Sequence, residues 1–270
     1  GIPFNNKYEP RMRIGAFDFF ADGKSAAVCT WDGDVWIVSN IDDQLQKVKW
    51  KRFATGLHEP LGLKIVDGKI YTVGDNQITR FHDLNNDGEA DFLENFNNDW
   101  DATEGFHAFC FDLQTDPQGN FYFSMGCPVR AGGAGFERLG RHHGCVLKVS
   151  PSGDELSIFA SGFRAPNGIG VGPNGEVTTG DNEGSFIPTA PLNWVKPGSF
   201  NGVVDSYRGD HNLKSSPISG YEVPYTDWGE YRRSFMKRPG FQHFPEEAPK
   251  PLVWMSKKRG VDNSGGGQVW

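Results

Sequence analysis

The sequence predicts an all-β fold of the β-propeller type, in which small antiparallel sheets pack as blades around a central channel. One cassette recurs along the chain: a polar approach, an apolar run, a tight turn with Gly, and a β-rich run. Copies roughly 45–60 residues apart are typical of propeller blades, and no window shows sustained helical periodicity. The clear copies are Glu59–Gly74, His107–Gly126 and Arg164–Gly180, and a weaker copy opens the chain at Arg13–Thr30.

Each copy carries a residue pair ending in Gly where its two strands meet. Gly adopts the positive φ that two-residue hairpin turns need, so we expect each pair to close such a hairpin. The pairs are Asp22-Gly23, Asp67-Gly68, Gln118-Gly119 and Asn174-Gly175.

Blades that pack around an axis bring the approaches to their inner strands to one place. The residue leading into each inner strand then points at the mouth of the central channel. We therefore expect residues that are far apart in sequence to converge there, namely Arg13, Glu59, His107, Arg164 and Asn167.

Composition narrows the class of protein. The 270 residues include 35 Gly and 17 Pro, which suits many turns, and 13% are aromatic, which suits a packed core. A net charge of −7 argues against a nucleic-acid surface and favours small or neutral ligands. No apolar run approaches the length of a membrane span, and no targeting segment opens the chain, so we expect a mature or trimmed product.

The whole chain, residues 1–270, is predicted to form one propeller domain that belongs to a longer polypeptide, because a closed propeller of this blade size needs more chain. Residues 184–260 are rich in Pro, Gly and aromatics without clean alternation. We expect an irregular insertion there, over the rim of the active face or at an interface. A degenerate blade is the alternative.

The strongest local motif is the acidic segment Asp83–Glu94, which fits D-x-[DN]-x-[DN]-G-x5-E at every position. This spacing places oxygen ligands around calcium, and Gly88 permits the sharp turn. The preceding segment is β-like, so we expect a structural calcium clip between blades and an extracytoplasmic location, periplasmic or secreted. An acidic surface loop is the alternative. The expected ligands are Asp83, Asn85, Asp87, Glu89 (through its carbonyl), Asp91 and Glu94.

His107 is the candidate general base, because it directly precedes a predicted inner strand and His has a pKa near neutrality. Arg164, Asn167 and Asn182 lie at the entrance and exit of the next cassette. Arg binds a carboxylate or carbonyl bidentately, and Asn and Asp ligate hard cations. The plainer alternatives are a histidine satisfied by a backbone carbonyl and ordinary turn residues.

A Gly-rich basic loop joins Cys127 to Cys145. It is expected either to close as a lid over an anionic cofactor or substrate, or to be solvated. Of two adjacent histidines, at most one faces the channel. The two cysteines either form a disulfide at the base of the loop or are buried thiols. The basic residues are Arg130, Arg138, Arg141, His142 and His143.

The segment GFRAPNGIGVGPNGEVTTGDNEG, followed by PGSFNG, resembles the G-H-R-N-P-Q-G…P-x-G segment of soluble PQQ-dependent glucose and sorbosone dehydrogenases. His107 matches that family's catalytic histidine. The resemblance implies a six-bladed propeller, calcium, PQQ bound across the channel mouth, and sugar oxidation by hydride transfer. It implies that His107 is the base and Arg164 a PQQ contact. We extend the cofactor set to Asn167, Arg130, His143 and Asn182.

The chain is also similar to bacterial extracytoplasmic propellers that carry a cytochrome c module. It has no C-x-x-C-H and no dinucleotide fingerprint of its own, so we expect an external electron acceptor such as a cytochrome.

Two other functions are open. APNGIGVGPNGEV resembles a motif of gluconolactonase-like propellers, which implies a metal-dependent lactone hydrolase. Its metal would be held by Glu59, Asn167 and either Asp181 or Asp262. The third is a non-catalytic scaffold that docks a partner.

Overall fold

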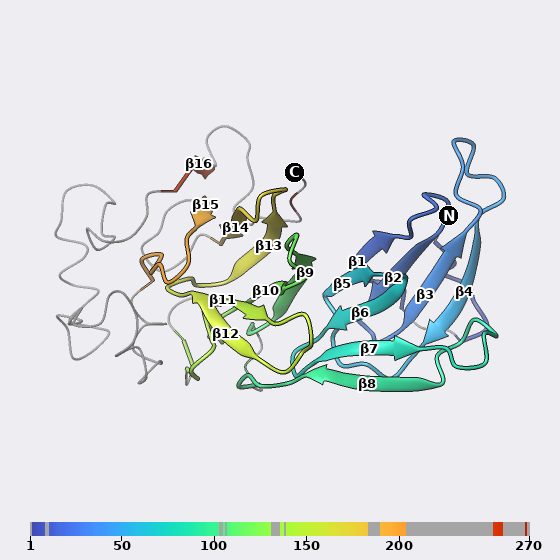
Figure 1. Ribbon diagram of the computed structural model, residues 1–270, viewed down its shortest axis with the longest axis horizontal. Coiled ribbons are helices and arrows are strands. Elements are labelled where there is room, and N and C mark those ends of the chain that lie inside the picture. Colours follow the sequence, from blue (N-terminus) through green and yellow to red (C-terminus); the bar gives the residue numbers. More distant parts are fainter. Residues whose placement is uncertain are drawn as a thin grey trace.

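The computed structural model describes residues 2–8, 11–102, 105, 107–130, 136–137, 139–182, 190–203, 251–255 and 268. Regular structure in these residues is entirely β, with strands β1 to β16 forming four sheets of four strands each. In every sheet, strands that follow one another in the sequence pair antiparallel, so each sheet is a blade (Figure 1). No helix long and apolar enough to span a membrane occurs in the described part of the chain.

The four blades follow the chain in order. Blade 1 contains β1 (Ile14–Phe19), β2 (Ala26–Thr30), β3 (Val35–Ser39) and β4 (Lys49–Ala54). Blade 2 contains β5 (Gly62–Val66), β6 (Lys69–Val73), β7 (Ile78–His82) and β8 (Phe92–Asn97). Blade 3 contains β9 (Cys110–Thr115), β10 (Phe121–Met125), β11 (Cys145–Val149) and β12 (Leu156–Ala160). Blade 4 contains β13 (Pro166–Val171), β14 (Val177–Asp181), β15 (Ala190–Val195) and β16 (Val253–Met255).

The first strands of the blades, β1, β5, β9 and β13, lie side by side as the inner strands. The Asp18 carboxylate of β1 accepts the Ile65 N–H of β5 at 2.9 Å, and Asp112 of β9 accepts the Ile169 N–H of β13 at 2.8 Å. A Cβ on Gly62 would lie 2.4 Å from the Asp112 carbonyl carbon, so β5 reaches β9 only with glycine there. The inner strands therefore face one common axis.

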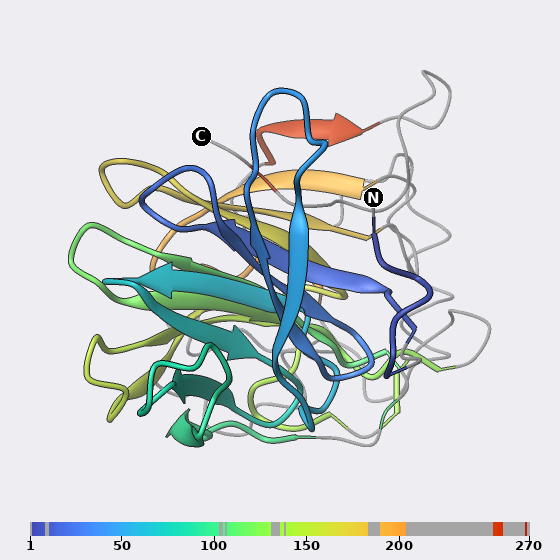
Figure 2. The same ribbon diagram turned by 90° about the vertical axis from the view of Figure 1, so that its right-hand side faces the viewer.

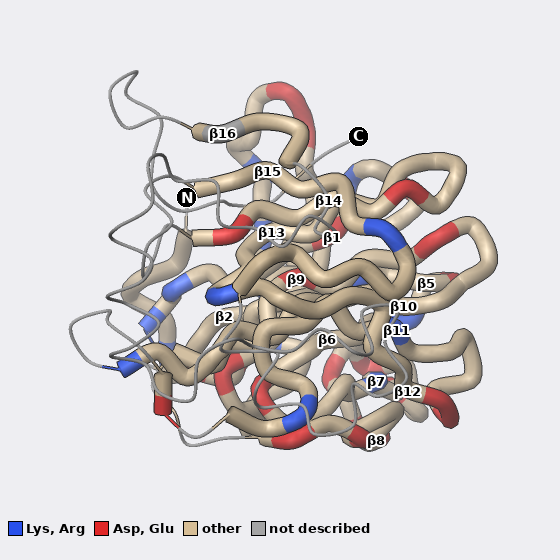
Figure 3. Tube along the Cα trace, turned by 90° about the vertical axis from the view of Figure 1, so that its left-hand side faces the viewer, with Lys and Arg blue, Asp and Glu red and all other residues tan. Residues whose placement is uncertain are grey.

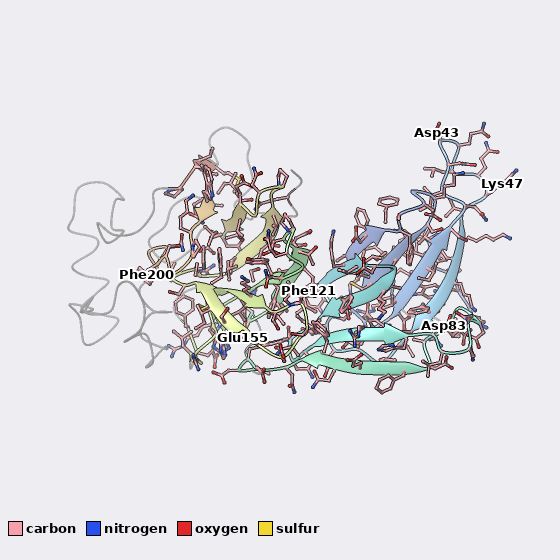
Figure 4. All side chains as sticks on the ribbon, viewed as in Figure 1. Asp43, Lys47, Asp83, Phe121, Glu155 and Phe200 are labelled. Atoms are coloured by element: carbon pink, nitrogen blue, oxygen red, sulfur yellow. The ribbon has the colours of Figure 1, made fainter. Side chains whose placement is uncertain are left out.

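Apolar clusters fill the spaces between blades. Between blades 2 and 3, the fully buried Phe121 lies 4.9 Å from the Tyr71 ring and 5.3 Å from the Phe96 ring, near the middle of the molecule (Figure 4). Similar clusters join blade 1 to blade 2 and blade 3 to blade 4. The blades thus stabilise one another through these buried clusters. Figure 2 shows their arrangement in the view onto blade 1. Charged residues of both signs are interspersed over the turns and strands of the blades (Figure 3).

The four predicted Gly turns all join the first two strands of a blade, as expected. Only Asp67 and Gly68 form a two-residue hairpin, with φ of 48° and 74°. In the other blades the first two strands are joined by residues 20–25, 116–120 and 172–176, where only the Gly has positive φ. There the Gly N–H bonds the carbonyl three residues earlier, so the prediction of two-residue hairpins is wrong for three of the four.

Four blades are described, and the closed six-bladed ring remains a prediction. Within residues 184–260, β15 and β16 pair with each other, and β15 pairs with β14, to complete blade 4. Most of that range lies outside the described residues, as do Arg138 and Asp262.

Candidate active site at the channel mouth

His107 and Arg164 lie at the same end of the inner strands. Gly126, just after β10, stands between the two loops: a Cβ there would be 3.0 Å from the His107 carbonyl oxygen and 3.7 Å from the Ala165 Cα. The Cys127 N–H donates to the Arg164 carbonyl at 2.8 Å. The structure thus brings together two residues from neighbouring blades.

The other predicted members of the convergence also lie at this end. Arg13 directly precedes β1 and pairs with Asp32 at 2.6 Å. Glu59, with a left-handed φ of 45°, lies in the loop before β5, and Asn167 is the second residue of β13. The His107 side chain is exposed, Asn167 is half-buried and Arg164 is buried.

Asp181 fixes the approach to β13. Its Oδ2 accepts the Arg164 N–H at 2.8 Å, and its Oδ1 accepts the N–H groups of Ala165 at 2.8 Å and Asn182 at 2.9 Å. Burial raises the pKa of this carboxyl to about 6, and the three amides oppose the rise. Asp181, a metal ligand in the lactonase alternative, has both oxygens occupied by backbone amides. The Oδ1 of neighbouring Asn182 is buried and has no hydrogen-bond partner among the described residues.

Asp75 is a site residue that the sequence reasoning missed. It corresponds to Asp181 of blade 4, because Gly-Asp-Asn stands at the end of the second strand in both blades: it directly follows β6, and its Gly and Asp are the last two residues of β14. That repeated tripeptide was the available signal. Its Oδ1 is buried, and no residue that the structure describes forms a hydrogen bond with it. Burial and the negative charge of Glu59 raise the pKa of Asp75 to about 6, and nearby His58 opposes the rise.

The described residues at the end of the basic loop are bonded to the connection between β8 and β9. The Asp101 N–H donates to His142 Nδ1 at 3.1 Å, and the Arg141 N–H donates to Asp101 Oδ2 at 2.9 Å. His143 is 2% exposed, and its Nδ1 accepts the Gly140 N–H at 2.6 Å. Burial lowers the pKa of His143 to about 4, so its neutral ring offers no charge to an anionic cofactor. Arg130 is exposed.

The cysteines at the ends of this loop are buried thiols. Cys127 donates to the Phe163 carbonyl at 3.4 Å, and Cys145 donates to the His143 carbonyl at 3.5 Å. The disulfide alternative is therefore not realised.

The predicted calcium loop connects β7 to β8 at the end of blade 2 where Asp83 lies (Figure 4). The Asp83 carboxylate accepts the Gly88 N–H at 2.8 Å, and Asp91 accepts the Leu84 N–H at 2.7 Å. The Asn85 amide group donates to Asp87 at 3.1 Å and to Asp91 at 3.2 Å. Over the described residues, no three His, Cys, Asp or Glu side chains form a group that holds a metal as they stand. The carboxylate and amide oxygens of the loop are of the type that calcium binds, and in this structure the carboxylates accept hydrogen bonds from N–H groups of the same loop.

Glu94, the last expected ligand, lies in β8, and its carboxylate contacts side chains of β7 rather than the loop. It accepts two hydrogen bonds from Arg80, at 2.6 and 2.7 Å, and lies 2.6 Å from His82 Nε2. The loop does lie between blades: the Ala90 N–H donates to the Phe53 carbonyl of β4 at 2.8 Å, and Lys51 bonds the Asp87 carbonyl.

No protein-family model matches the sequence, and no curated protein does. Solved structures share the fold. A family AA12 carbohydrate-active enzyme from Trichoderma reesei has a TM-score of 0.61 at 14% identity, over 90% of this chain and 67% of that chain. The oxidoreductase (glucose dehydrogenase) from Thermus thermophilus has a TM-score of 0.53 at 18% identity, over 71% of this chain and 64% of that chain. The PQQ domain of Coprinopsis cinerea pyranose dehydrogenase has a TM-score of 0.56 at 10% identity, over 71% of this chain and 54% of that chain.

This chain therefore spans between 54% and 67% of the length of these three structures. At such identities the similarity shows the architecture, and the chain is an all-β propeller.

Proposed function

We propose that this protein is a sugar dehydrogenase of the propeller type, which oxidises a carbohydrate hydroxyl with a PQQ-type quinone. The observation that carries the proposal is the placement of the loops of the exposed His107 and of Arg164 on either side of Gly126, at the entry end of the inner strands. Similarity in fold to glucose and pyranose dehydrogenases supports it.

The role of His107 follows from its exposure and its place. An exposed imidazole at the channel mouth accepts the proton of a sugar hydroxyl. This proton transfer accompanies the loss of hydride from the carbon that bears the hydroxyl. Asp181 keeps Arg164 in place through the backbone, since its carboxylate binds the Arg164 and Ala165 amides. Arg164 then orients a carbonyl or carboxylate group beside the base.

A quinone, when bound, supplies the hydride acceptor. One of the expected contacts fits such a group, because Arg164 offers a cation to its carbonyl or carboxylate oxygens. Asn182 has a buried Oδ1 that finds no hydrogen-bond partner among the described residues, and this acceptor suits an N–H or O–H of a ligand rather than a quinone oxygen. His143 does not fit, because it is buried and neutral. Asn167 and the exposed Arg130 remain proposed contacts.

Calcium in the loop of Asp83, Asn85, Asp87, Glu89 and Asp91 is the structural part of the proposal. Binding there replaces the amide contacts of the side chains and strengthens the clip between blades 1 and 2. We further propose an extracytoplasmic location and an external acceptor of cytochrome type. In the lactonase alternative, a metal at Asp181 would have to share the carboxylate with backbone amides, and Asp262, the other possible ligand, lies outside the described residues. A scaffold needs none of these groups.

The test is an artificial-dye assay of sugar oxidation with and without added PQQ. We expect turnover only with the quinone, and a loss of several orders of magnitude in kcat for His107→Ala with an unchanged unfolding temperature. Turnover without any quinone contradicts the cofactor assignment. Lactone hydrolysis that depends on a divalent cation replaces the proposal with the hydrolase alternative.

A further inference from the structure

A chain of aromatic rings crosses the channel mouth from blade 1 to blade 3. The Trp31 ring, in the turn after β2, lies 5.0 Å from the Phe109 ring, which directly precedes β9. Phe109 lies 5.5 Å from Phe111 and 6.0 Å from His107. Blade 2 separates blades 1 and 3, so Trp31 reaches past the entry of β5 to make this contact.

The Trp31 position is held by its own blade. The backbone N–H of Trp31 donates to the Arg13 carbonyl at 2.8 Å, and the Arg13 guanidinium lies 5.1 Å from the centre of the Trp31 ring. Asp32 binds the same guanidinium through two hydrogen bonds, at 2.6 and 3.2 Å. The ring is therefore placed before any ligand arrives.

These rings differ from the aromatic clusters of the core. Phe121 and Phe123 are at most 1% exposed, whereas Trp31, Phe109 and Phe111 are all partly exposed. The groups around them are polar: the Arg13–Asp32 pair at one end and the exposed His107 at the other. Apolar rings with a few polar groups at their edge are the composition of small-molecule binding sites.

We infer that Trp31 and Phe109, whose rings meet edge to face at an interplanar angle of 71°, form an angled platform that binds the ring of a carbohydrate beside His107. A pyranose presents an apolar face of C–H groups and a rim of hydroxyls, which matches aromatic rings flanked by a charged pair. The inference rests on the proposed function for its substrate class, yet it makes a claim about binding that needs no cofactor and no turnover.

The test uses fluorine NMR of the cofactor-free protein labelled with 5-fluorotryptophan, titrated with D-glucose. The chain has eight Trp residues, and Trp31→Phe identifies the signal of Trp31. We expect the Trp31 signal to shift saturably and the signal of Trp194, which is 39% exposed on blade 4, to stay in place. Sorbitol has the hydroxyls but no ring face, and we expect it to bind at least tenfold more weakly.

Calorimetry of variants completes the test. Trp31→Ala is expected to weaken glucose binding at least tenfold, and Trp194→Ala to leave it unchanged. If Trp31→Ala does not fold, Phe109→Leu takes its place under the same criterion. An unmoved Trp31 signal, or a variant that binds glucose like the wild type, overturns the inference. Glucose binding at Trp31 without PQQ-dependent turnover overturns the proposed dehydrogenase and leaves the platform standing.

Discussion

Asp75 and Asp181 occupy the same place in their blades but have opposite surroundings. The carboxylate of Asp181 accepts three backbone N–H groups, whereas one oxygen of Asp75 is buried without a partner and Glu59 adds a second negative charge nearby. Asp181 thus holds the backbone that leads into β13, whereas the charged form of Asp75 is destabilised at the channel mouth.

The first prediction concerns the pH dependence of stability. In the folded protein the pKa of Asp75 is about 6, above the ordinary value of 3.8. Below about pH 4 both states are protonated, so the group contributes nothing. Between about pH 4 and 6 the unfolded chain releases its proton first, so the folded state loses stability with rising pH, and the loss is complete above pH 6. Asp75→Asn should therefore raise the free energy of unfolding at pH 8 by about 1–3 kcal/mol, and change it little at pH 4.

Asp181→Asn is the matched control in the other blade. An amide side chain leaves an NH₂ group facing a backbone N–H, so at least one buried amide loses its acceptor. At pH 4 we expect a loss of about 1–3 kcal/mol, measured by urea unfolding. The loss should be smaller at pH 8, because burial also raises the pKa of Asp181 to about 6 and the wild-type carboxylate therefore costs stability above that pH. An Asp181→Asn that is stabilised at pH 4, or an Asp75→Asn that is destabilised at pH 8, contradicts the assignment of the two roles.

The second prediction concerns calcium. An ion that binds only the folded protein stabilises it, by about 2.7 kcal/mol at a concentration one hundred times the Kd. Chelation of calcium-loaded protein should therefore lower the Tm, and Asp87→Ala should abolish that response. Asp154→Ala is the control, because Asp154 lies in an acidic turn between β11 and β12, where its carboxylate accepts hydrogen bonds from two serines. No change in Tm on chelation contradicts the calcium clip.

Glu94 gives a third prediction, because its geometry points to Arg80 and His82 rather than to the loop. Glu94→Gln should weaken these half-exposed interactions and cost about 0.5–1.5 kcal/mol. The response of Tm to calcium should survive, since the loop side chains remain. If Glu94→Gln removes that response while Asp91→Asn keeps it, then Glu94 closes the calcium shell as the sequence motif suggests.

The repeat made much of the fold predictable. Gly-containing turns and apolar runs mark β1 and β2, β5 and β6, and the equivalent pairs in blades 3 and 4, because local turn chemistry and alternation determine them. The third and fourth strands of the blades were harder to predict. β15 and β16 pair across a gap of 57 residues, from Val195 to Val253, so no local pattern marks them as neighbours.

The convergence of the loops at the candidate site was predictable, but the hydrogen bonding and protonation of its side chains were not. The approach to each inner strand predicted that the loops of His107 and Arg164 meet, because topology alone brings them together. Whether a carboxylate has amide partners depends on atoms from distant loops, which is why Asp75 was missed and Asp181 was taken as a possible metal ligand. For the same reason the sequence predicted His143 as a cofactor contact, although burial lowers the pKa of its ring to about 4 and its Nδ1 accepts the Gly140 N–H.

The last prediction tests how closely the inner strands approach. Gly62 has the Asp112 backbone against the position of a Cβ, at 2.4 Å from its carbonyl carbon and 2.6 Å from its oxygen. Backbone atoms of β9 do not move aside without breaking the bond from the Asp112 carboxylate to the Ile169 N–H. Gly62→Ala should therefore cost at least about 3 kcal/mol, at the upper end for overpacking. Gly23→Ala is the matched control, since Gly23 has open space around it and a φ of 62°, which costs an Ala about 1–2 kcal/mol. Equal losses of unfolding free energy in urea for the two variants contradict the close contact of β5 with β9.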